Sequence, residues 1–303
     1  MANTTFSGPV RSENGFKLTS KTASTGVVHD RTFGTTAKDA RRYYLEEYFS
    51  KKPGLNAVSI IDPDADSASD LAAFVIANRD FETLGTNYTT ALTTFAAHQA
   101  GILMTTATAD QDQGILLPHL DTNQTAWSGT KWGTENQVQW ECSIQAAQTD
   151  NEKIWAGLKL TNDQLIATDD DKIFFKYATD AGNGEALTTF ANWHVVHSIG
   201  GTDYISRLPI AFAADTPYHL KIVIDSDRKA TVFVNGIQYN LTSTAGSTGG
   251  TAVTAVQPGK AVVKSAALTN DVNLIPYIGI ENGDAAAAVL NVHYTAISRH
   301  VYE

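Results

Sequence analysis

From about residue 95 onward, short apolar runs alternate with turn residues, and no helical periodicity of comparable quality intervenes. Near the C-terminus the alternation is strict: Leu220, Ile222 and Ile224 share one parity, with Lys221 and Val223 on the other. Runs of this length and period predict β-strands with one buried and one solvated face. Parallel strands need crossover helices, so the pattern predicts an antiparallel β-sandwich. The expected strands are 71–77, 101–106, 114–117, 137–145, 153–160, 172–177 and 193–198.

Asn235-Gly236 is the strongest turn signal in the chain. It separates the apolar runs 231–234 and 237–239. A type I′ turn needs positive φ at both central residues, which Asn-Gly accepts, so the sequence predicts a β-hairpin here. The polar segment 226–228 is expected to join the preceding strand to this hairpin.

One segment, residues 36–52, carries a helical pattern. Thr36 and Asp39 resemble a capping box, and Lys51-Lys52 followed by Pro53-Gly54 supply a basic last turn and a stop. The apolar face of this expected α-helix consists of Ala37, Ala40, Tyr44, Leu45, Tyr48 and Phe49. We expect this face to pack on the protein's own sandwich; the alternative is that its tyrosines form an intersubunit contact.

Residues 1–34 contain too few apolar side chains for a core and several turn signals, so they predict an extended N-terminal arm. The expected organisation is therefore two parts. Residues 1–58 form an arm with one helix that binds a partner, and residues 59–303 form the sandwich.

Charge is distributed unevenly between these parts. The chain has 22 Lys and Arg against 32 Asp and Glu, a net charge of −10 that argues against broad nucleic-acid binding. Residues 1–52 hold nine basic and five acidic residues, giving +4, and the other 13 basic and 27 acidic residues give −14. This asymmetry favours a division of labour between a basic leader and an acidic body.

A single cysteine, Cys142, excludes an intramolecular disulfide framework, and no Cys/His cluster has zinc-like spacing. The N-terminus lacks the charged and apolar regions of a signal peptide, and no apolar run approaches the ~18 residues of a spanning helix. We therefore expect a soluble protein that is not exported, has no membrane partner, and needs no metal or cofactor.

The C-terminal third resembles the concanavalin A-like (laminin G-like) family. The resemblance rests on the runs 218–224, 230–236 (ending Val-Asn-Gly), 274–280 and 290–294, and Trp127, Trp132 and Trp140 are compatible with the first half of that fold. It implies an antiparallel jelly-roll β-sandwich. It does not imply one function, because such sandwiches serve as lectins, glycosidases and scaffolds.

Glycosidases of that family carry a Glu-x-Asp-x-x-Glu strand, which this sequence lacks. Glu135 and Glu141 would share parity on a strand, but Gln137 and Gln139 stand between them, so we interpret both acids as structural and expect no enzymatic activity. His194 and His197 lie three apart on an expected strand and would face opposite sides.

Two acidic runs were considered as calcium loops. The run 62–66 has Ser67 and Ala73 where an EF-hand needs Gly and Glu, so a solvated turn is expected. The run 169–171 could bind calcium as some concanavalin-like proteins do, although a solvated loop is the preferred interpretation.

The opening, residues 1–17, resembles the start of structural proteins from tailed bacteriophages. It implies a virion component, and the main hypothesis is a capsid decoration (cement) protein that is made in the host cytoplasm. The expected partners are the major capsid protein, on the outside of the shell, and further copies of this chain in a homo-oligomer for which a trimer would suit a shell axis. The residues expected to contact the capsid are Phe6, Arg11, Phe16, Lys17, Arg31, Arg41, Tyr44 and Tyr48.

An alternative from another class is a carbohydrate-binding adhesin module of a head or tail fibre. It would place Trp127 and Trp132 at a host-surface glycan, because aromatic faces suit pyranose rings. A third interpretation, an internal or neck-associated structural protein, also stays open.

Overall fold

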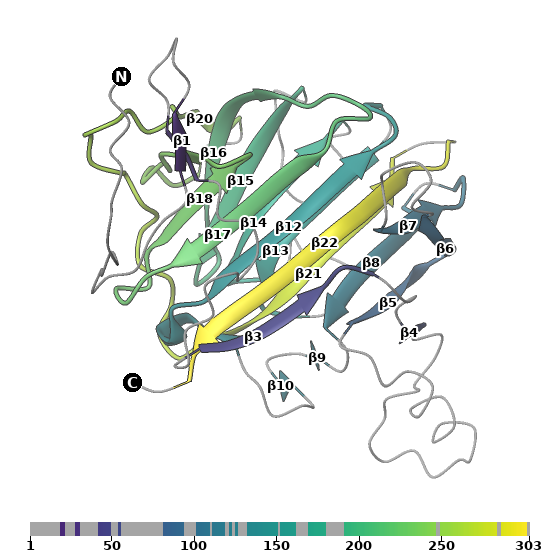
Figure 1. Ribbon diagram of the computed structural model, residues 1–303, viewed down its shortest axis with the longest axis horizontal. Coiled ribbons are helices and arrows are strands. Elements are labelled where there is room, and N and C mark those ends of the chain that lie inside the picture. The colour runs from purple at the N-terminus through teal and green to yellow at the C-terminus, as the bar shows by residue number, and fades with distance from the viewer. Residues whose placement is uncertain are drawn as a thin grey trace, which may run out of the picture.

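Two facing β-sheets make up the body of the protein (Figure 1). The computed structural model describes residues 19–21, 28–30, 42–49, 54–55, 81–93, 101–109, 111–118, 121–122, 125–126, 132–150, 152–161, 169–179, 191–246, 249–283 and 286–301. The strand expected at 71–77 lies outside these residues. None of the described helical structure is long and apolar enough to cross a membrane.

The eight-stranded sheet runs in the order β19, β18, β17, β12, β22, β7 and β6, with β3 also paired to β22. All of its pairings are antiparallel. Its strands are β3 Arg42–Glu47, β6 Tyr88–Thr93, β7 Gly101–Thr106, β12 Gln139–Ala146, β17 Tyr218–Ile224, β18 Ala230–Val234, β19 Ile237–Tyr239 and β22 Val289–His300.

The ten-stranded sheet runs in the order β20, β16, β15, β14, β13, β21, β8, β5 and β4, with β11 paired to β21. Its edge pairs β4–β5 and β16–β20 are parallel, and its other pairings are antiparallel. Its strands are β4 Gly54–Leu55, β5 Phe81–Thr86, β8 Gln113–Pro118, β11 Trp132–Gly133, β13 Glu152–Lys159, β14 Lys172–Ala178, β15 Asn192–Ile199, β16 Thr202–Ala211, β20 Thr251–Ala252 and β21 Asn273–Asn282. The predicted mainly β sandwich is confirmed, and it is consistent with a concanavalin A-like fold.

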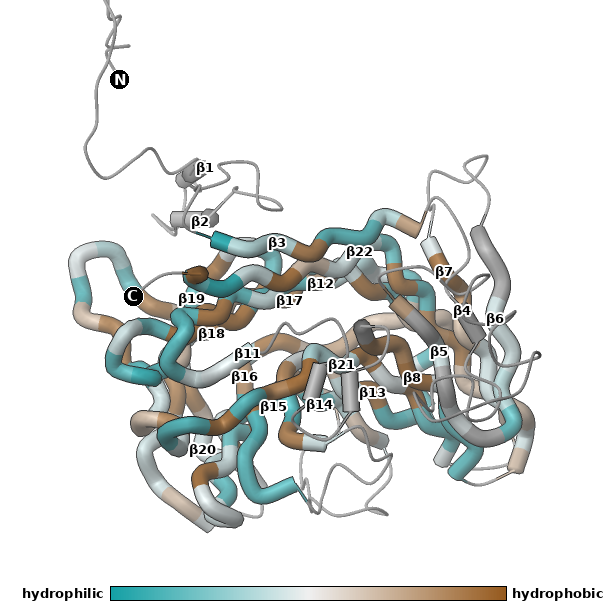
Figure 2. Tube along the Cα trace, turned by 90° about the horizontal axis from the view of Figure 1, so that it is seen from below, coloured by the Kyte–Doolittle hydropathy of each residue, from teal (hydrophilic) through white to brown (hydrophobic). Residues whose placement is uncertain are grey.

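The main core lies between the two sheets, which Figure 2 shows nearly edge-on. Trp140 and Cys142 of β12 enter it from one sheet, and Ile154 and Leu158 of β13 enter it from the other. Because side chains alternate along a strand, the intervening residues of each strand point to the outer faces.

The outer faces of the two sheets differ. In β17, buried and half-buried residues alternate as the sequence predicted. In β13 and β14 every residue is buried, and Trp155 and Phe174 belong to a second apolar cluster. A charge on that face is paired: Lys153 Nζ lies 2.8 Å from Glu281 Oε1. The outer face of the eight-stranded sheet is thus partly solvated, as the sequence predicted, whereas the outer face in the middle of the ten-stranded sheet is buried.

The expected helix is wrong over its described part. Residues 42–47 form the strand β3, paired antiparallel with Thr295–His300 of β22, and residues 36–41 and 50–52 lie outside the described residues. Leu45 packs against the core, and Tyr44 pairs with Ser298 on the opposite face. Tertiary pairing overrides a local helical pattern here, since the end of β22 offers a backbone ladder and Tyr suits a strand.

The leader is described only in part. β1 (Thr19–Lys21) and β2 (Val28–Asp30) form an antiparallel pair, and β2 lies beside β19 of the sandwich. The extended arm expected over residues 1–34 is not confirmed by these six residues, which form a short antiparallel pair. Two more short strands, β9 (Asp121–Thr122) and β10 (Thr125–Ala126), pair with each other.

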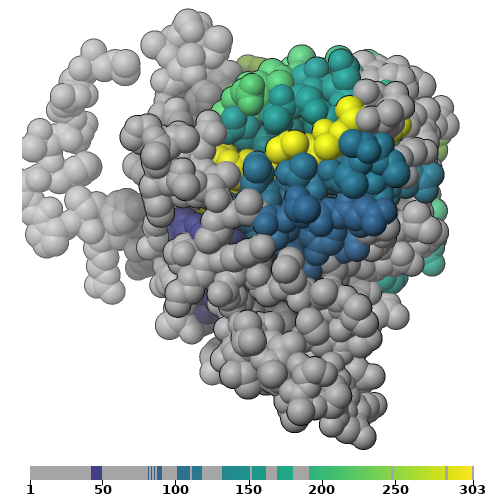
Figure 3. All heavy atoms as spheres, turned by 90° about the vertical axis from the view of Figure 1, so that its right-hand side faces the viewer, coloured from purple at the N-terminus to yellow at the C-terminus, as the bar shows by residue number. Residues whose placement is uncertain are grey.

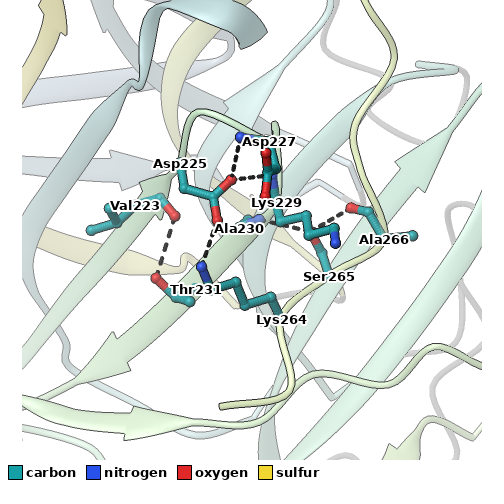
Figure 4. A network of polar contacts seen from close by, with 9 residues as sticks. All are labelled: Val223, Asp225, Asp227, Lys229, Ala230, Thr231, Lys264, Ser265 and Ala266. Carbon is teal, nitrogen blue, oxygen red and sulfur yellow. Dashed lines mark hydrogen bonds and ion pairs between the residues drawn. The ribbon is translucent and has the colours of Figure 1, made fainter. Parts of the chain in front are cut away.

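Two tight turns join β17, β18 and β19, as predicted. Asn235 and Gly236 have φ of 48° and 78°, which the type I′ turn requires. In the other turn, Asp225 Oδ1 accepts hydrogen bonds from the backbone N–H of Asp227 and Lys229, and Lys264 Nζ lies 2.6 Å from Asp225 Oδ2 (Figure 4). The carboxylate of Asp225 therefore stabilises the turn by accepting hydrogen bonds from its backbone.

Replacing Asp225 with alanine should lower the free energy of unfolding by about 1–2 kcal/mol, because two backbone donors lose their acceptor. Lys264→Ala should cost less than about 0.5 kcal/mol, since the side chain of Lys264 is 40% exposed and its ion pair is screened. Urea denaturation of both variants measures these losses in the free energy of unfolding. Equal losses would contradict the assignment of the turn to Asp225.

Glu152, at the start of β13, is fully buried, and within the described residues its carboxyl oxygens have no hydrogen-bond partner. Burial, with a contribution from Asp150, raises the pKa of Glu152 to about 9. The folded state thus keeps a proton that the unfolded state releases near pH 4.5, and Glu152 costs stability increasingly as pH rises from there to about 9.

Glu152→Gln should therefore raise the free energy of unfolding by about 2–3 kcal/mol at pH 8 and change it little at pH 4. Denaturant titrations of both proteins at the two pH values provide the comparison. A gain that does not depend on pH would show that Glu152 is ionised in the folded protein.

Candidate partner-binding face

The outer surface of the eight-stranded sheet carries a compact group of polar and aromatic side chains. We call it the β3 face and define it by Tyr48, Glu141, His219, Lys221 and Tyr294. Glu141 points outward because its neighbours Trp140 and Cys142 lie in the core. The register places Lys221 directly opposite Glu141. Tyr48 follows β3, which Figure 1 shows beside β22.

Glu141 is the centre of this group, with 5% of its surface exposed. Its Oε1 accepts a hydrogen bond of 3.0 Å from the Tyr294 hydroxyl. Its Oε2 lies 3.5 Å from Lys221 Nζ and 3.6 Å from His219 Nε2. One buried carboxylate thus contacts side chains from both neighbouring strands.

Electrostatics favours the ionised form of this carboxylate. Burial alone would raise the pKa of Glu141, but the interaction with His219, the charge of Lys221 and the Tyr294 hydroxyl together lower it below its usual value. Burial and the nearby negative charge of Glu141 raise the pKa of Tyr294. At neutral pH the tyrosine is therefore a hydrogen-bond donor and Glu141 an acceptor.

Two tyrosines of the leader lie partly in solvent. Tyr48 is 52% exposed, and its ring centroid lies 4.7 Å from that of Tyr294. Tyr43 is 39% exposed, and its ring centroid lies 5.8 Å from that of Trp132. At the start of β3, Arg42 donates hydrogen bonds to the Ser298 hydroxyl and the Gln137 carbonyl.

Of the expected capsid-contacting residues, the structure describes Tyr44 and Tyr48. Tyr48 is exposed and belongs to the β3 face, whereas Tyr44 is half-buried and lies opposite Ser298 in the register of β3 and β22. Phe6, Arg11, Phe16, Lys17, Arg31 and Arg41 lie outside the described residues. The grouping around Glu141 could not be predicted from the sequence, because the pairing of β12 with β17 and β22 that creates it has no local signal.

The aromatic residues of the glycan hypothesis are not on an open surface where they are described. Trp132 is 3% exposed and belongs to the main core, as does Trp140. Trp127 lies outside the described residues. The Trp132 ring therefore offers no free face for a sugar to stack on.

The carboxylates of Asp169 and Asp171 in the acidic loop 169–171 accept hydrogen bonds from other parts of the protein. Asp169 accepts hydrogen bonds from the backbone and hydroxyl of Thr161, and Asp171 accepts them from Gly200 and Thr269. Within the described part of the chain, no group of three or more His, Cys, Asp or Glu residues could hold a metal ion. The run 62–66 lies outside it.

His194 and His197 are both fully buried in β15. His194 pairs with Arg207 of β16, whereas the ring of His197 stacks on that of Tyr204 at 4.8 Å. Desolvation lowers the pKa of each to about 4, so both are neutral at pH 7. We therefore interpret both histidines as structural residues of β15. Glu135 accepts hydrogen bonds from the Thr134 hydroxyl and from the backbone N–H of Asp271, which is consistent with a structural role.

No protein-family model and no curated protein sequence matches the chain. Among solved structures, a protein of unknown function from Shewanella oneidensis is 13% identical with a TM-score of 0.47, covering 89% of this chain and 91% of that one. Peanut lectin is 10% identical with a TM-score of 0.44, covering 87% and 100%. A Bacillus licheniformis β-glucanase is 9% identical with a TM-score of 0.40, covering 69% and 81%. At these values the likenesses carry no argument about function.

Trp132→Ala should lower the free energy of unfolding by about 3–5 kcal/mol, because it leaves a large hole in the core. Chemical denaturation followed by circular dichroism measures the loss. A loss below about 1 kcal/mol would contradict the buried placement of Trp132.

Proposed function

We propose that this protein is a capsid decoration protein of a tailed bacteriophage, which binds the outside of the major capsid protein shell and stabilises it. The observation that carries the proposal is the position of β3. This strand of the basic leader is paired with β22, and the exposed Tyr48 that follows it packs on Tyr294 at the outer face of the same sheet. Leader and sandwich would thus contribute to one binding surface around Tyr48. The phage-like opening, residues 1–17, supports the virion assignment.

The charges of the two parts suit this role. A leader of +4 complements an acidic shell, which aids encounter and register more than affinity. Affinity would come from aromatic anchors, since Tyr and Arg are enriched among residues that dominate binding energy. Many copies, each bound only to the assembled shell, would stabilise that shell by mass action. Self-association about a shell axis, as a trimer or another symmetric oligomer, belongs to the same proposal.

Co-sedimentation with purified shells tests this proposal. Deleting residues 1–34 should weaken binding at least tenfold, and Tyr48→Ala should weaken it about three- to tenfold by removing an exposed aromatic contact. Val263→Ala is the matched control, because Val263 is 51% exposed and lies in a loop away from β3. Undiminished binding of the deletion variant would refute the role of the leader.

A second candidate is a carbohydrate-binding adhesin module of a head or tail fibre. The exposed ring of Tyr48 favours it, because this ring packs on Tyr294 on the face that also carries Lys221 and His219, and glycan sites combine an aromatic face with a few polar groups. A glycan array probed with the full chain and with Tyr48→Ala would separate the two functions. Binding that is lost in the variant supports an adhesin, and an array without hits removes this candidate.

A further inference from the structure

β3 is attached to the sandwich in two ways. Its backbone pairs with Thr295–His300 of β22 along one edge. Just beyond its C-terminal end, the ring of Tyr48 packs on the ring of Tyr294. The first attachment is a regular ladder of main-chain hydrogen bonds. The second depends on particular side chains and can therefore be changed without altering the ladder.

The side-chain attachment continues inward to a buried charge. The hydroxyl of Tyr294 donates a hydrogen bond to Glu141, and Glu141 lies within 3.6 Å of Lys221 and His219. Three strands thus meet at one carboxylate: β22 through Tyr294, β12 through Glu141, and β17 through the two basic residues. The ring of Tyr48 packs on Tyr294, the member of this group that belongs to β22.

A buried charge held by partners on several strands is sensitive to the loss of any one of them. Removing the charge of Glu141 leaves Lys221, whose side chain is only 13% exposed, without its counter-charge, and it changes the group that lies 3.6 Å from His219 Nε2. It also weakens the charge-assisted bond that fixes the hydroxyl of Tyr294. The ring on which Tyr48 packs then loses its fixed orientation.

We propose that β3, with the leader attached to it, is a strap whose C-terminal end is held on the sandwich by Glu141 acting through Tyr294 and Tyr48. Neutralising Glu141 loosens this strap while the rest of the two sheets stays folded, and it uncovers the backbone edge of β22 over Thr295–His300 and the ring of Tyr294. The inference concerns the isolated chain and does not depend on the proposed function.

Acid is one way to loosen the strap. The groups that face this site are Glu46 and Tyr48 from the leader, Tyr294 from β22, and His219 and Lys221 from β17. Because the pKa of Glu141 is lowered in the folded state, its contribution is complete above the unfolded value of 4.5 and is lost as pH falls through the folded value. Loosening is therefore expected only below about pH 4.5.

Hydrogen exchange measured by mass spectrometry on the full-length protein at pH 7 tests the strap. Glu141→Gln and Tyr294→Phe should each speed exchange of the amides of residues 42–47 at least tenfold. Exchange in β14 should change less than twofold. Thr89→Ala is the matched control, because Thr89 is exposed on β6, an edge strand of the same sheet that is separated from β22 by β7. It should leave both regions unchanged.

Unchanged exchange at residues 42–47 in both variants would overturn the proposal. So would an equal increase in β14, because Glu141 would then stabilise the whole fold and not the strap. If Glu141→Gln does not fold, Tyr294→Phe decides, since it keeps both the charge of Glu141 and the ring under Tyr48. Global unfolding of both variants also counts against a strap.

Discussion

Main-chain pairing along the C-terminal strand β22 is the interaction on which the eight-stranded sheet depends. On one side β22 pairs with β12 along most of its length, from Leu290 to Ser298. On the other side it pairs first with β7 and then with β3. The C-terminal residues accordingly lie between segments that are far apart in the sequence (Figure 3). The end of the chain therefore completes a sheet that its beginning also joins.

A second constraint concerns the charged side chains that are buried within this apolar framework. The chain has no disulfide, since Cys142 is its single cysteine and is buried. Lysines on the outer face of the ten-stranded sheet are buried beside acids, as Lys153 is beside Glu281. Glu141 plays the same part on the other sheet. Such pairs contribute little net stability, but removing one partner is costly, so they fix which arrangement of strands is stable.

Much of the fold could be predicted from the sequence, because strand periodicity and turn chemistry are local. The strand 101–106 and the Asn235-Gly236 hairpin are confirmed for this reason. The helix expected around Tyr44 is wrong, because its cap and stop signals were local while the competing partner, β22, lies some 250 residues away. The candidate site could be predicted only in part. The sequence points to Tyr48, one of the five residues that define the β3 face, whereas the relation of Tyr48 to Glu141 depends on the register of β12, β17 and β22.

The central claim is that leader and sandwich together bind the outside of a phage capsid. Electron microscopy of intact virions, labelled with an antibody specific for this chain, tests it most directly. The account predicts label distributed over the head surface. Label confined to the tail tip, with none on the head, would contradict it.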